Sequence, residues 1–398
     1  MKILMAFHAP PYPPDIGPSR RHYHVLSETL RRHDVSVLSL GTAADHAAFR
    51  DHFGARALDS TFVPNSNAPL VSAARRGWYL ATGRSDFRRL RRRRFQQMLD
   101  ALGERRFDLA YFSTTMLGCY RLPGRVPLVG DTHNIEHDNL ARASRESERR
   151  WRRAYYHAQA RLTRREELAY ASRFSIVCTT SERDRELLAR LVPHVTTTVV
   201  PNGIDLERYR RPADATPRPG EVLFTGLMSY YPNRHGIVRF AQHIWPRVVS
   251  RVPRATLRIV GADPPAAVRA LRCAHVEVTG RVTDVRPAYA RAQACVVPLW
   301  IGGGTRVKAL EAMAMGVPIV STPLGCEGLD VHDGRSVVIG HTDEQLADGL
   351  VAVLTRPALR SRLAAEALAL VGEYDWRRVG LALEAAFRRA RRTAVHAH

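Results

Sequence analysis

The sequence predicts an α/β protein made of two doubly wound parallel sheets, each flanked by helices. Short apolar runs with the composition of buried parallel strands alternate with helical segments between residues 2 and 205, and the alternation begins again near residue 221. Between the two halves, residues 211–220 contain three prolines and a glycine, which interrupt any helix or inner strand. With 398 residues, the chain is long enough for two domains with separate cores.

The first half opens with a strand and a long proline-rich loop. Lys2–Phe7 is apolar enough for a buried strand, and a helix is expected over residues 19–32, followed by a second strand. The loop between them, residues 8–17, lies at the carboxyl end of the first strand, where open α/β sheets bind ligands. It is a candidate binding loop, with Asp15 and Gly17 near its end; the alternative is a rigid surface excursion.

Polar side chains cluster at the end of another expected strand, within residues 126–136. Asp131 and His133 are two apart on an extended segment and share a face, and Asn134 and Glu136 follow them. These residues could be metal ligands, a catalytic cluster, or caps for the next helix. Two groups alone do not make a metal site, and the chain contains no Asp-x-Asp pair.

The second half repeats the alternation of strands and helices. We expect strands at residues 222–227, 256–260, 276–279 and 294–298. We expect helices at residues 237–249, 266–272, 285–291 and, at the end of the chain, 375–392. This pattern predicts a second doubly wound sheet.

The second half is organised around residues 296–322. A strand ending at Leu299 is followed by three glycines at 302–304 and by Thr305, which stands at a natural helix N-cap position. Good helix formers then predict a short helix over residues 306–315, which a glycine and a proline terminate. A strand, a glycine loop and a helix start are thus expected in direct succession.

Positive charge is concentrated at the start of this helix. Arg306 and Lys308 lie in its first turn, where the helix dipole is already positive and disfavours cations. Such a helix start makes sense if an anion, most simply a phosphate, binds there. The alternative is a tight turn with solvated charges, in which Lys308 and Glu311, three residues apart, lie side by side.

The composition indicates a globular protein with a polyanionic partner. The formal charge is +22, which points to nucleic acid, an anionic membrane or a phosphorylated substrate. Lys2 and Lys308 are the lysines, so nearly all of this charge is arginine. Five scattered cysteines without CxxC spacing and the lack of a signal sequence favour a reducing, cytoplasmic location.

Two arginine-rich runs have several interpretations. Residues 87–95 and 142–165 would ordinarily be solvated charged faces of helices. The aromatic residues near the first run could instead place it on an anionic bilayer. Aromatics interleaved with arginines in the second run would suit RNA stacking. No RNA-binding signature accompanies either run, so nucleic acid is not an expected partner.

Several motifs together resemble a known family. In chain order they are residues 201–205 (PNGID), 224–226 (FTG), 257–261 (LRIVG), 278–284 (VTGRVTD) and 304–318 (GTRVKALEAMAMGVP). They resemble the C-terminal half of the retaining GT-B glycosyltransferases of group 1, also called glycosyltransferase family 4. The resemblance implies two Rossmann-like domains facing a cleft and transfer of a sugar from a nucleotide-sugar with retained anomeric configuration, with no cofactor and no obligatory metal.

The resemblance also assigns parts of the chain. The implied parts are an acceptor domain at 1–205, a linker at 206–220, a nucleotide-sugar-binding domain at 221–374, and a last helix at 375–398 that packs back on the first domain. The loop that carries Asp15 and Gly17 becomes an acceptor loop. The acceptor would be a glycan, a lipid-linked molecule or a small molecule, which is compatible with a peripheral position on the inner face of a membrane.

Individual residues carry over by their place in the motifs. Glu311 matches the second glutamate of the family's Glu-x7-Glu motif, which holds the ribose hydroxyls of the donor. The first glutamate would fall at Gly303, so the contact to the donor sugar must come from elsewhere, such as the amides of Gly303 and Gly304. His133 matches the family's histidine near the donor sugar; alternatively, it caps the following helix.

The loop after Gly226 departs from the family. Where the family usually has an arginine and a lysine, this chain reads LMSYYPNR over residues 227–234. We therefore predict that Lys308, with Arg306 and the amides of Gly304 and Thr305, holds the departing diphosphate instead. Arg234 is a possible third cation. The alternative leaves Lys308 on the outer surface, paired with the nearby glutamate.

Three functions compete at this point. The first is a glycosyltransferase, with donor-binding residues in the Gly226 and Gly303 loops. The second is a GT-B nucleotide-sugar epimerase, which needs more acid–base groups in its cleft. The third is a non-catalytic protein that binds an anionic surface or RNA. Acceptor-dependent release of nucleoside diphosphate separates the first function from the other two.

Overall fold

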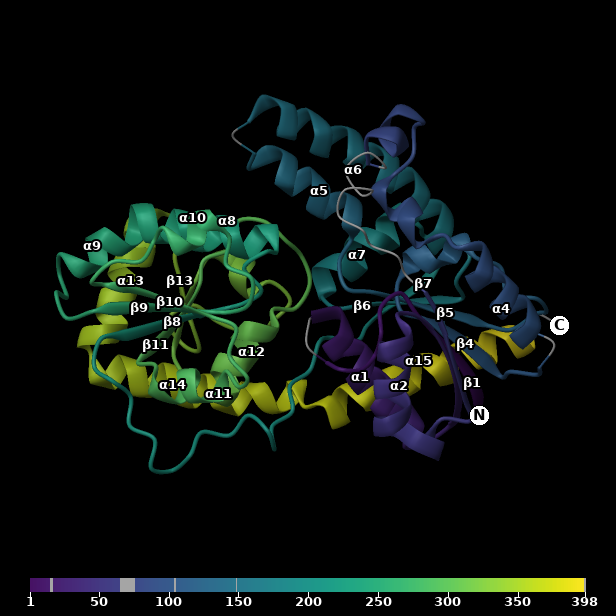
Figure 1. Ribbon diagram of the computed structural model, residues 1–398. Coiled ribbons are helices and arrows are strands. Elements are labelled where there is room, and N and C mark those ends of the chain that lie inside the picture. Colours follow the sequence, from purple (N-terminus) through teal and green to yellow (C-terminus); the bar gives the residue numbers. More distant parts are fainter. Residues whose placement is uncertain (15–16, 65–75, 104, 148, 397–398) are drawn as a thin grey trace. The chain divides into compact units, whose positions relative to one another are not determined.

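The computed structural model describes residues 1–14, 17–64, 76–103, 105–147 and 149–396. It divides into two compact units (Figure 1). Unit 1 comprises Met1–Pro201 and Trp376–His398, and unit 2 comprises Asn202–Asp375. Each unit is built on one parallel sheet with flanking helices, which confirms the predicted α/β class with two doubly wound domains.

The sheet of unit 1 has the strand order β3-β2-β1-β4-β5-β6-β7. Its strands are β1 (Lys2–Phe7), β2 (Asp34–Leu40), β3 (Asp59–Val63), β4 (Leu109–Phe112), β5 (Leu128–Thr132), β6 (Ile176–Thr179) and β7 (Thr196–Val199). In β1, Ile3, Met5 and Phe7 enter one core, while Leu4 and Ala6 enter the core on the other face. A strand buried on both faces needs a continuous apolar run, and β1 has one. The strand order reverses between β1 and β4, where doubly wound sheets bind ligands.

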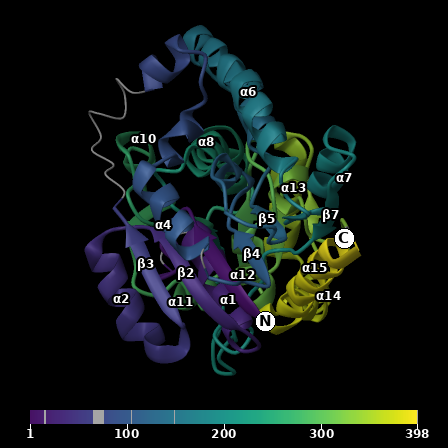
Figure 2. The same cartoon turned by 90° about the vertical axis from the view of Figure 1, so that its right-hand side faces the viewer.

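Helices cover both faces of this sheet (Figure 2). They are α1 (Gly17–Leu30), α2 (Ala43–Phe53), α4 (Arg93–Gly103), α5 (Glu136–Arg145), α6 (Arg150–Ala171), α7 (Glu182–Leu191) and α15 (Trp376–His396), with short 3₁₀ turns η1 (Gly54–Arg56), η2 (Asp86–Leu90) and η3 (Thr115–Cys119). Helix α15 returns to unit 1 and packs against α1. In the turn after α1, His33 Nε2 lies 2.5 Å from Glu384 Oε2 of α15. The chain's last helix therefore belongs to the core of its first unit.

The sheet of unit 2 has the order β10-β9-β8-β11-β12-β13. Its strands are β8 (Glu221–Thr225), β9 (Thr256–Val260), β10 (Val276–Gly280), β11 (Ala294–Val297), β12 (Ile319–Ser321) and β13 (Val338–Ile339). Its helices are α8 (Tyr231–Arg239), the π-helix η4 (Phe240–Ile244), α9 (Trp245–Val249), α10 (Ala266–Arg269), α11 (Arg286–Arg291), α12 (Val307–Ala314), α13 (Asp343–Thr355) and α14 (Pro357–Val371), with 3₁₀ turns η5 (Pro323–Cys326) and η6 (Gly372–Tyr374). The strand order reverses between β8 and β11, so the loops after these two strands meet at the expected ligand edge.

Two local expectations differ from the structure. Residues 206–220, which we expected to form a linker, lie within unit 2, where Arg211 Nη2 donates to Ala290 O at 2.6 Å. Residues 87–95 do not form one helix, because η2 ends at Leu90 and α4 begins at Arg93. Leu90 and Phe95 enter the core, and this packing outweighs the helical propensity of the arginines.

No helix in the described part of the chain is both long and apolar enough to span a membrane.

Candidate active site

A buried ion pair holds the ligand edge of unit 1 together. Arg21 on α1 donates to both carboxylate oxygens of Asp131 at 2.7 and 2.9 Å, and both side chains are almost completely buried. Tyr111 also donates to Asp131, at 2.6 Å. Arg21 further donates to the carbonyls of Val200 and Pro201, where the chain leaves unit 1. Asp131 is thus committed to this network, because a buried charge must be paired.

Three histidines lie together at the same edge. The ring centroids of His8, His22 and His133 are separated by 4.8 to 5.8 Å. The His8 amide donates to Ser113 Oγ at 3.0 Å, and His8 Nδ1 lies 2.9 Å from the same oxygen. One ring nitrogen of His8 is thus held by Ser113, which leaves the other ring nitrogen to bond a ligand. No cluster of three or more metal-ligating side chains occurs among the described residues, so the metal interpretation of this edge finds no support.

Burial keeps these histidines uncharged. Burial and then Arg89 lower the pKa of His8 to about 4, and burial lowers the pKa of His22 and His133 well below the usual value. At neutral pH the cluster therefore offers uncharged donors and acceptors, which suit hydroxyl groups. Burial, followed by the nearby Glu167, raises the pKa of Glu136 to about 8.

His133 does not cap the helix that follows it. Helix α5 has Ile135 at its N-cap, without a side-chain capping bond. Glu167 of α6 caps it instead by accepting from the amides of Glu136 and His137 at 2.9 and 3.2 Å.

Of the two acceptor-loop residues, Gly17 is the first residue of α1, and Asp15 lies outside the described residues.

In unit 2, the glycine loop joins β11 to α12. Gly302 and Gly304 have φ of +123° and +71°, a conformation that favours glycine. Helix α12 begins at Val307 with Arg306 at the N-cap, so our prediction of Thr305 at that position is wrong. The backbone of Thr305 is instead held by Asn202, whose Nδ2 donates to Thr305 O at 3.1 Å.

Arg306 braces this loop. Its Nη1 donates to Gly303 O at 2.6 Å, and its Nε donates to Leu324 O at 3.2 Å. The guanidinium also lies 3.0 Å from where a Cβ at Gly302 would be, so a larger residue there would displace it. The structure thus places Arg306 against the backbone of the loop, whose glycines leave room for it.

Lys308 lies beneath the loop that follows β8. Its Nζ donates to Asn233 Oδ1 at 2.7 Å and sits 4.2 Å from the centre of the Phe224 ring. It is also 3.0 Å from where a Cβ at Gly226 would be. Lys308 is therefore not on the outer surface, contrary to the alternative interpretation. Burial lowers the pKa of Lys308 to about 7.

Asn233 connects the two loops. Besides accepting from Lys308, it donates from Nδ2 to Leu227 O at 3.0 Å, and it is itself buried. The neighbouring Arg234 lies over the ring of Tyr231, with 5.4 Å between the guanidinium carbon and the ring centre. Asn233 was not predicted as a site residue, because an asparagine after a proline usually marks only a turn.

Glu311 accepts hydrogen bonds from two tyrosines. Tyr209 donates to Oε1 at 2.8 Å, and Tyr289 donates to Oε2 at 2.9 Å. The Tyr289 hydroxyl also lies 2.7 Å from Thr225 Oγ1, at the end of β8. Glu311 is 4% exposed, and it lies one helical turn after Lys308. Sequence reasoning missed both tyrosines, and Tyr209 falls in the segment expected to be a linker.

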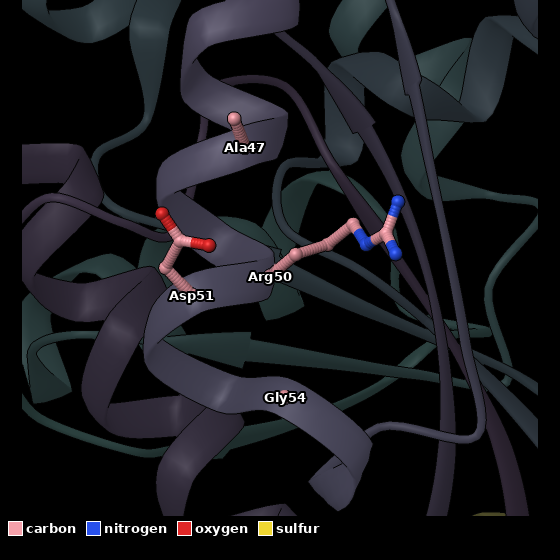
Figure 3. A pocket seen from close by; sticks show the side chains of 4 residues that line it. All are labelled: Ala47, Arg50, Asp51 and Gly54. Atoms are coloured by element: carbon pink, nitrogen blue, oxygen red, sulfur yellow. The ribbon is translucent and has the colours of Figure 1, made fainter.

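A hollow on helix α2 lies apart from these residues. Ala47, Arg50, Asp51 and Gly54 line it (Figure 3). It contains none of the candidate site residues, and its lining is not at the carboxyl end of a strand. The geometry at the two sheet edges, and not this hollow, therefore defines the candidate site.

The chain has two doubly wound units, and its last helix returns to the first of them. This arrangement defines the GT-B class of proteins. Comparison with known sequences agrees with this class. Residues 17–208 match the profile described as "Glycosyltransferase Family 4", and residues 219–356 match the profile "Glycosyl transferases group 1". The chain belongs to this family, as its motifs indicated.

Curated relatives match part of the chain. It is 35% identical over 194 residues to the phosphatidyl-myo-inositol mannosyltransferase of Mycobacterium tuberculosis (strain H37Rv), which covers 44% of this chain and 50% of that protein. It is 28% identical over 218 residues to the D-inositol 3-phosphate glycosyltransferase of Rhodococcus erythropolis, covering 48% of each. The chain thus spans about half the length of the curated relatives it matches.

Solved structures match the whole fold. Sucrose-phosphate synthase from Thermosynechococcus elongatus superimposes with a TM-score of 0.71 at 17% identity, covering 98% of this chain and 99% of the other. Anabaena Alr3699/HepE, solved in complex with UDP and glucose, gives a TM-score of 0.70 at 15% identity, covering 98% and 100%. At these identities the likeness shows the fold. The epimerase alternative finds no support in these comparisons.

Proposed function

We propose that this chain transfers a sugar from a nucleotide-sugar to an acceptor hydroxyl, with retention at the anomeric carbon and without an obligatory metal ion. The observation that carries the proposal is the position of Lys308. Its ammonium lies under Gly226, at the edge where the strand order of unit 2 reverses. A half-buried lysine at a glycine-lined loop is suited to a diphosphate.

The roles of the site residues follow from their contacts. Lys308 would neutralise the charge that grows on the departing diphosphate, together with the amides of Gly304 and Thr305. Arg306 would hold the glycine loop in shape, since its guanidinium already binds two carbonyls of that region. Glu311 would accept from the ribose hydroxyls in a charge-assisted bond. The amides of the glycine loop would contact the donor sugar in place of the missing glutamate.

Unit 1 would receive the acceptor. Its uncharged His8 and His133 lie where the strand order reverses, and both can bond hydroxyl groups. The names of the curated relatives mention inositol and phosphate, in one case within a lipid. We propose a glycan, a lipid-linked molecule or a small polyol as the acceptor. A cytoplasmic location, peripheral on the inner face of a membrane, fits this proposal and the five free cysteines.

The proposal is tested by measuring nucleoside diphosphate release. A panel of nucleotide-sugars is first ranked by thermal shift, because a ligand that binds the folded state raises the melting temperature. The best donor is then incubated with and without candidate acceptors. Acceptor-dependent release is expected. A donor that raises the melting temperature but gives no release with any acceptor would favour the non-catalytic alternative.

Asn233→Ala is expected to lower kcat by about tenfold while changing the donor KM less, because Lys308 loses the partner that aims it. Asn233→Asp is the matched variant. A carboxylate there would pair with Lys308 and repel the diphosphate, so donor affinity should fall more than in the alanine variant. Steady-state kinetics on both variants check this order. Equal kinetics for wild type and Asn233→Ala would show that Lys308 needs no such positioning.

Donor binding is expected to take up about one proton above pH 7, because the Lys308 pKa of about 7 in the free protein must rise beside a diphosphate. Well below pH 7 the lysine is already charged in the free protein, so proton uptake approaches zero. Between pH 7 and the pKa of the complex, affinity should fall by up to about tenfold per pH unit. Calorimetry of an intact nucleotide-sugar in buffers of different ionisation enthalpy measures the uptake. Lys308→Arg should abolish it, since arginine stays charged.

A further inference from the structure

Helix α6 carries a continuous stripe of exposed basic residues, which we call the α6 ridge. It consists of Arg153, His157, Arg161, Arg164 and Arg165, all exposed. These positions follow one another at helical spacing and so share one face of the helix. From the first to the last the ridge is about 18 Å long at 1.5 Å per residue. In Figures 1 and 2, the N-terminal part of α6 projects beyond the strands of the unit 1 sheet.

The positive charge of the ridge is not neutralised by its own helix. The two carboxylates of α6 are used elsewhere: Glu166 accepts from Ser85 Oγ at 2.6 Å, and Glu167 lies 2.7 Å from His137 Nδ1. Within the part of the chain that the structure describes, no ion pair joins the arginines of the ridge to a carboxylate. Four guanidinium groups of exposed residues therefore have no counter-charge from the described residues, although Arg153 also donates to Ser147 O at 3.2 Å.

Two exposed tryptophans accompany the ridge. Trp151, at the start of α6, is 61% exposed, with the Arg152 guanidinium 5.2 Å from its ring centre. Trp78 is 54% exposed, with Arg84 at 5.4 Å. The segment that follows Trp78 is hydrogen-bonded to α6 through Ser85 and Asp86. Large apolar side chains with a polar edge are typical of the interface between water and lipid.

We propose that the α6 ridge, together with Trp151, docks this protein on an anionic phospholipid bilayer. A straight cationic stripe suits a helix that lies on the headgroups with its arginines on the phosphates. Trp151 lies at the N-terminal end of this helix, on the flank of the stripe toward Arg165 at about 100° per residue, and we place its indole at the acyl boundary. The other arginine run fits this role less well. The apolar side chains within it, Leu90 and Phe95, are buried in the core and are not available to enter the lipid. The proposal does not depend on sugar transfer.

Vesicle co-sedimentation tests the ridge. The vesicles are of phosphatidylcholine and phosphatidylglycerol in a ratio of about 7:3, at low salt, where surface charges are least screened. Replacing Arg153, Arg161, Arg164 and Arg165 with glutamine should weaken binding by about tenfold or more. The matched control replaces four exposed arginines of unit 2 in the same way: Arg218, Arg254, Arg269 and Arg356. The control should lose much less binding, although its net charge changes equally.

Equal losses in the two variants would overturn the proposal, because binding would then follow net charge and not the ridge. Unaltered vesicle binding in the ridge variant, with loss of binding to a single-stranded RNA, would also overturn it. The thermal shift with a nucleotide-sugar should be the same in the ridge variant and the wild type, which shows that the variant folds. This readout separates failure of the docking surface from failure of the proposed function.

The position of Trp151 gives a second readout. Brominated phosphatidylcholine in the same vesicles quenches an indole that reaches the acyl chains. Quenching is expected in the wild type and should fall in Trp151→Phe, whereas Trp300→Phe, a change in unit 2, should leave it unaltered. Equal quenching in wild type and Trp151→Phe would show that this tryptophan does not enter the lipid.

Discussion

Lys308→Ala should lower kcat at saturating donor by about 100-fold or more, by analogy with the loss of one oxyanion donor from an enzyme. Cleavage at the anomeric carbon leaves negative charge on the diphosphate, so a cation fixed at that point stabilises the transition state more than the ground state. The ammonium of Lys308 is fixed by Asn233 Oδ1 at 2.7 Å and by the face of Phe224. The ammonium therefore needs little reorganisation as charge develops on the diphosphate.

Two further variants separate charge from position. Lys308→Arg should recover only part of kcat, because a planar guanidinium cannot occupy the place of a compact ammonium between Asn233 and Gly226. Arg234→Ala removes a neighbouring cation that stacks on Tyr231, and it should cost less than Lys308→Ala unless Arg234 also reaches the diphosphate. Steady-state assays decide between these outcomes. A Lys308→Ala enzyme with nearly normal kcat would show that amides alone hold the leaving group.

The strands were the most predictable part of the fold. Inner strands such as β1 and β11 are buried on both faces, so only a continuous apolar run can form them, and such runs are visible in the sequence. The strand β3 was not predicted, since DSTFV mixes polar and apolar residues and none of its first four positions is fully buried. It is the edge strand of its sheet, where one flank has no neighbour and the pattern is weaker.

Helix boundaries were less predictable because packing decides them. Residues 87–95 have the composition of one helix, but hydrogen bonds to Tyr120 interrupt the helix between Leu90 and Arg93. Its hydroxyl accepts from the amide of Arg92 at 2.6 Å and donates to Leu90 O at 2.5 Å. Similarly, Thr305 has the chemistry of an N-cap, yet its backbone is held by Asn202, more than 100 residues earlier in the chain. Helix propensity depends on neighbouring residues in the sequence, whereas these contacts join residues far apart in the chain, so the sequence alone does not predict them.

The site was predictable in its loops but not in its contacts. The glycines at 302–304 and the basic helix start pointed to the right region of unit 2. Helical spacing also placed Lys308 and Glu311 near each other, but it gave no indication of what either side chain meets. Lys308 meets Asn233, and Glu311 meets Tyr209 and Tyr289. Such pairings depend on which strands are neighbours in the sheet, and that order is set by the fold as a whole.

Both oxygens of the Glu311 carboxylate already accept a hydrogen bond from a tyrosine, so a ribose hydroxyl must either share an oxygen with a tyrosine or replace it. Each carboxylate oxygen can accept more than one hydrogen bond, so Oε1 can keep the bond from Tyr209 while a ribose hydroxyl joins, or the hydroxyl can replace Tyr209. Tyr289 is fully buried and holds the opposite oxygen. Its hydroxyl therefore fixes the direction in which Glu311 points.

Glu311→Ala is accordingly expected to weaken nucleoside diphosphate binding by about 10- to 150-fold, the equivalent of one hydrogen bond to a charged group worth ~1.5–3 kcal/mol. Glu311→Gln keeps the shape and should lose less, because its amide still offers one acceptor. Tyr209→Phe leaves the carboxylate in place, so it should change affinity less than Glu311→Ala, with tighter binding if the tyrosine competes with ribose. Calorimetry gives the affinities, and thermal melts of the free variants report any loss of stability. If Glu311→Ala melts at a lower temperature yet binds the nucleoside diphosphate as tightly as wild type, Glu311 serves only to anchor the two tyrosines.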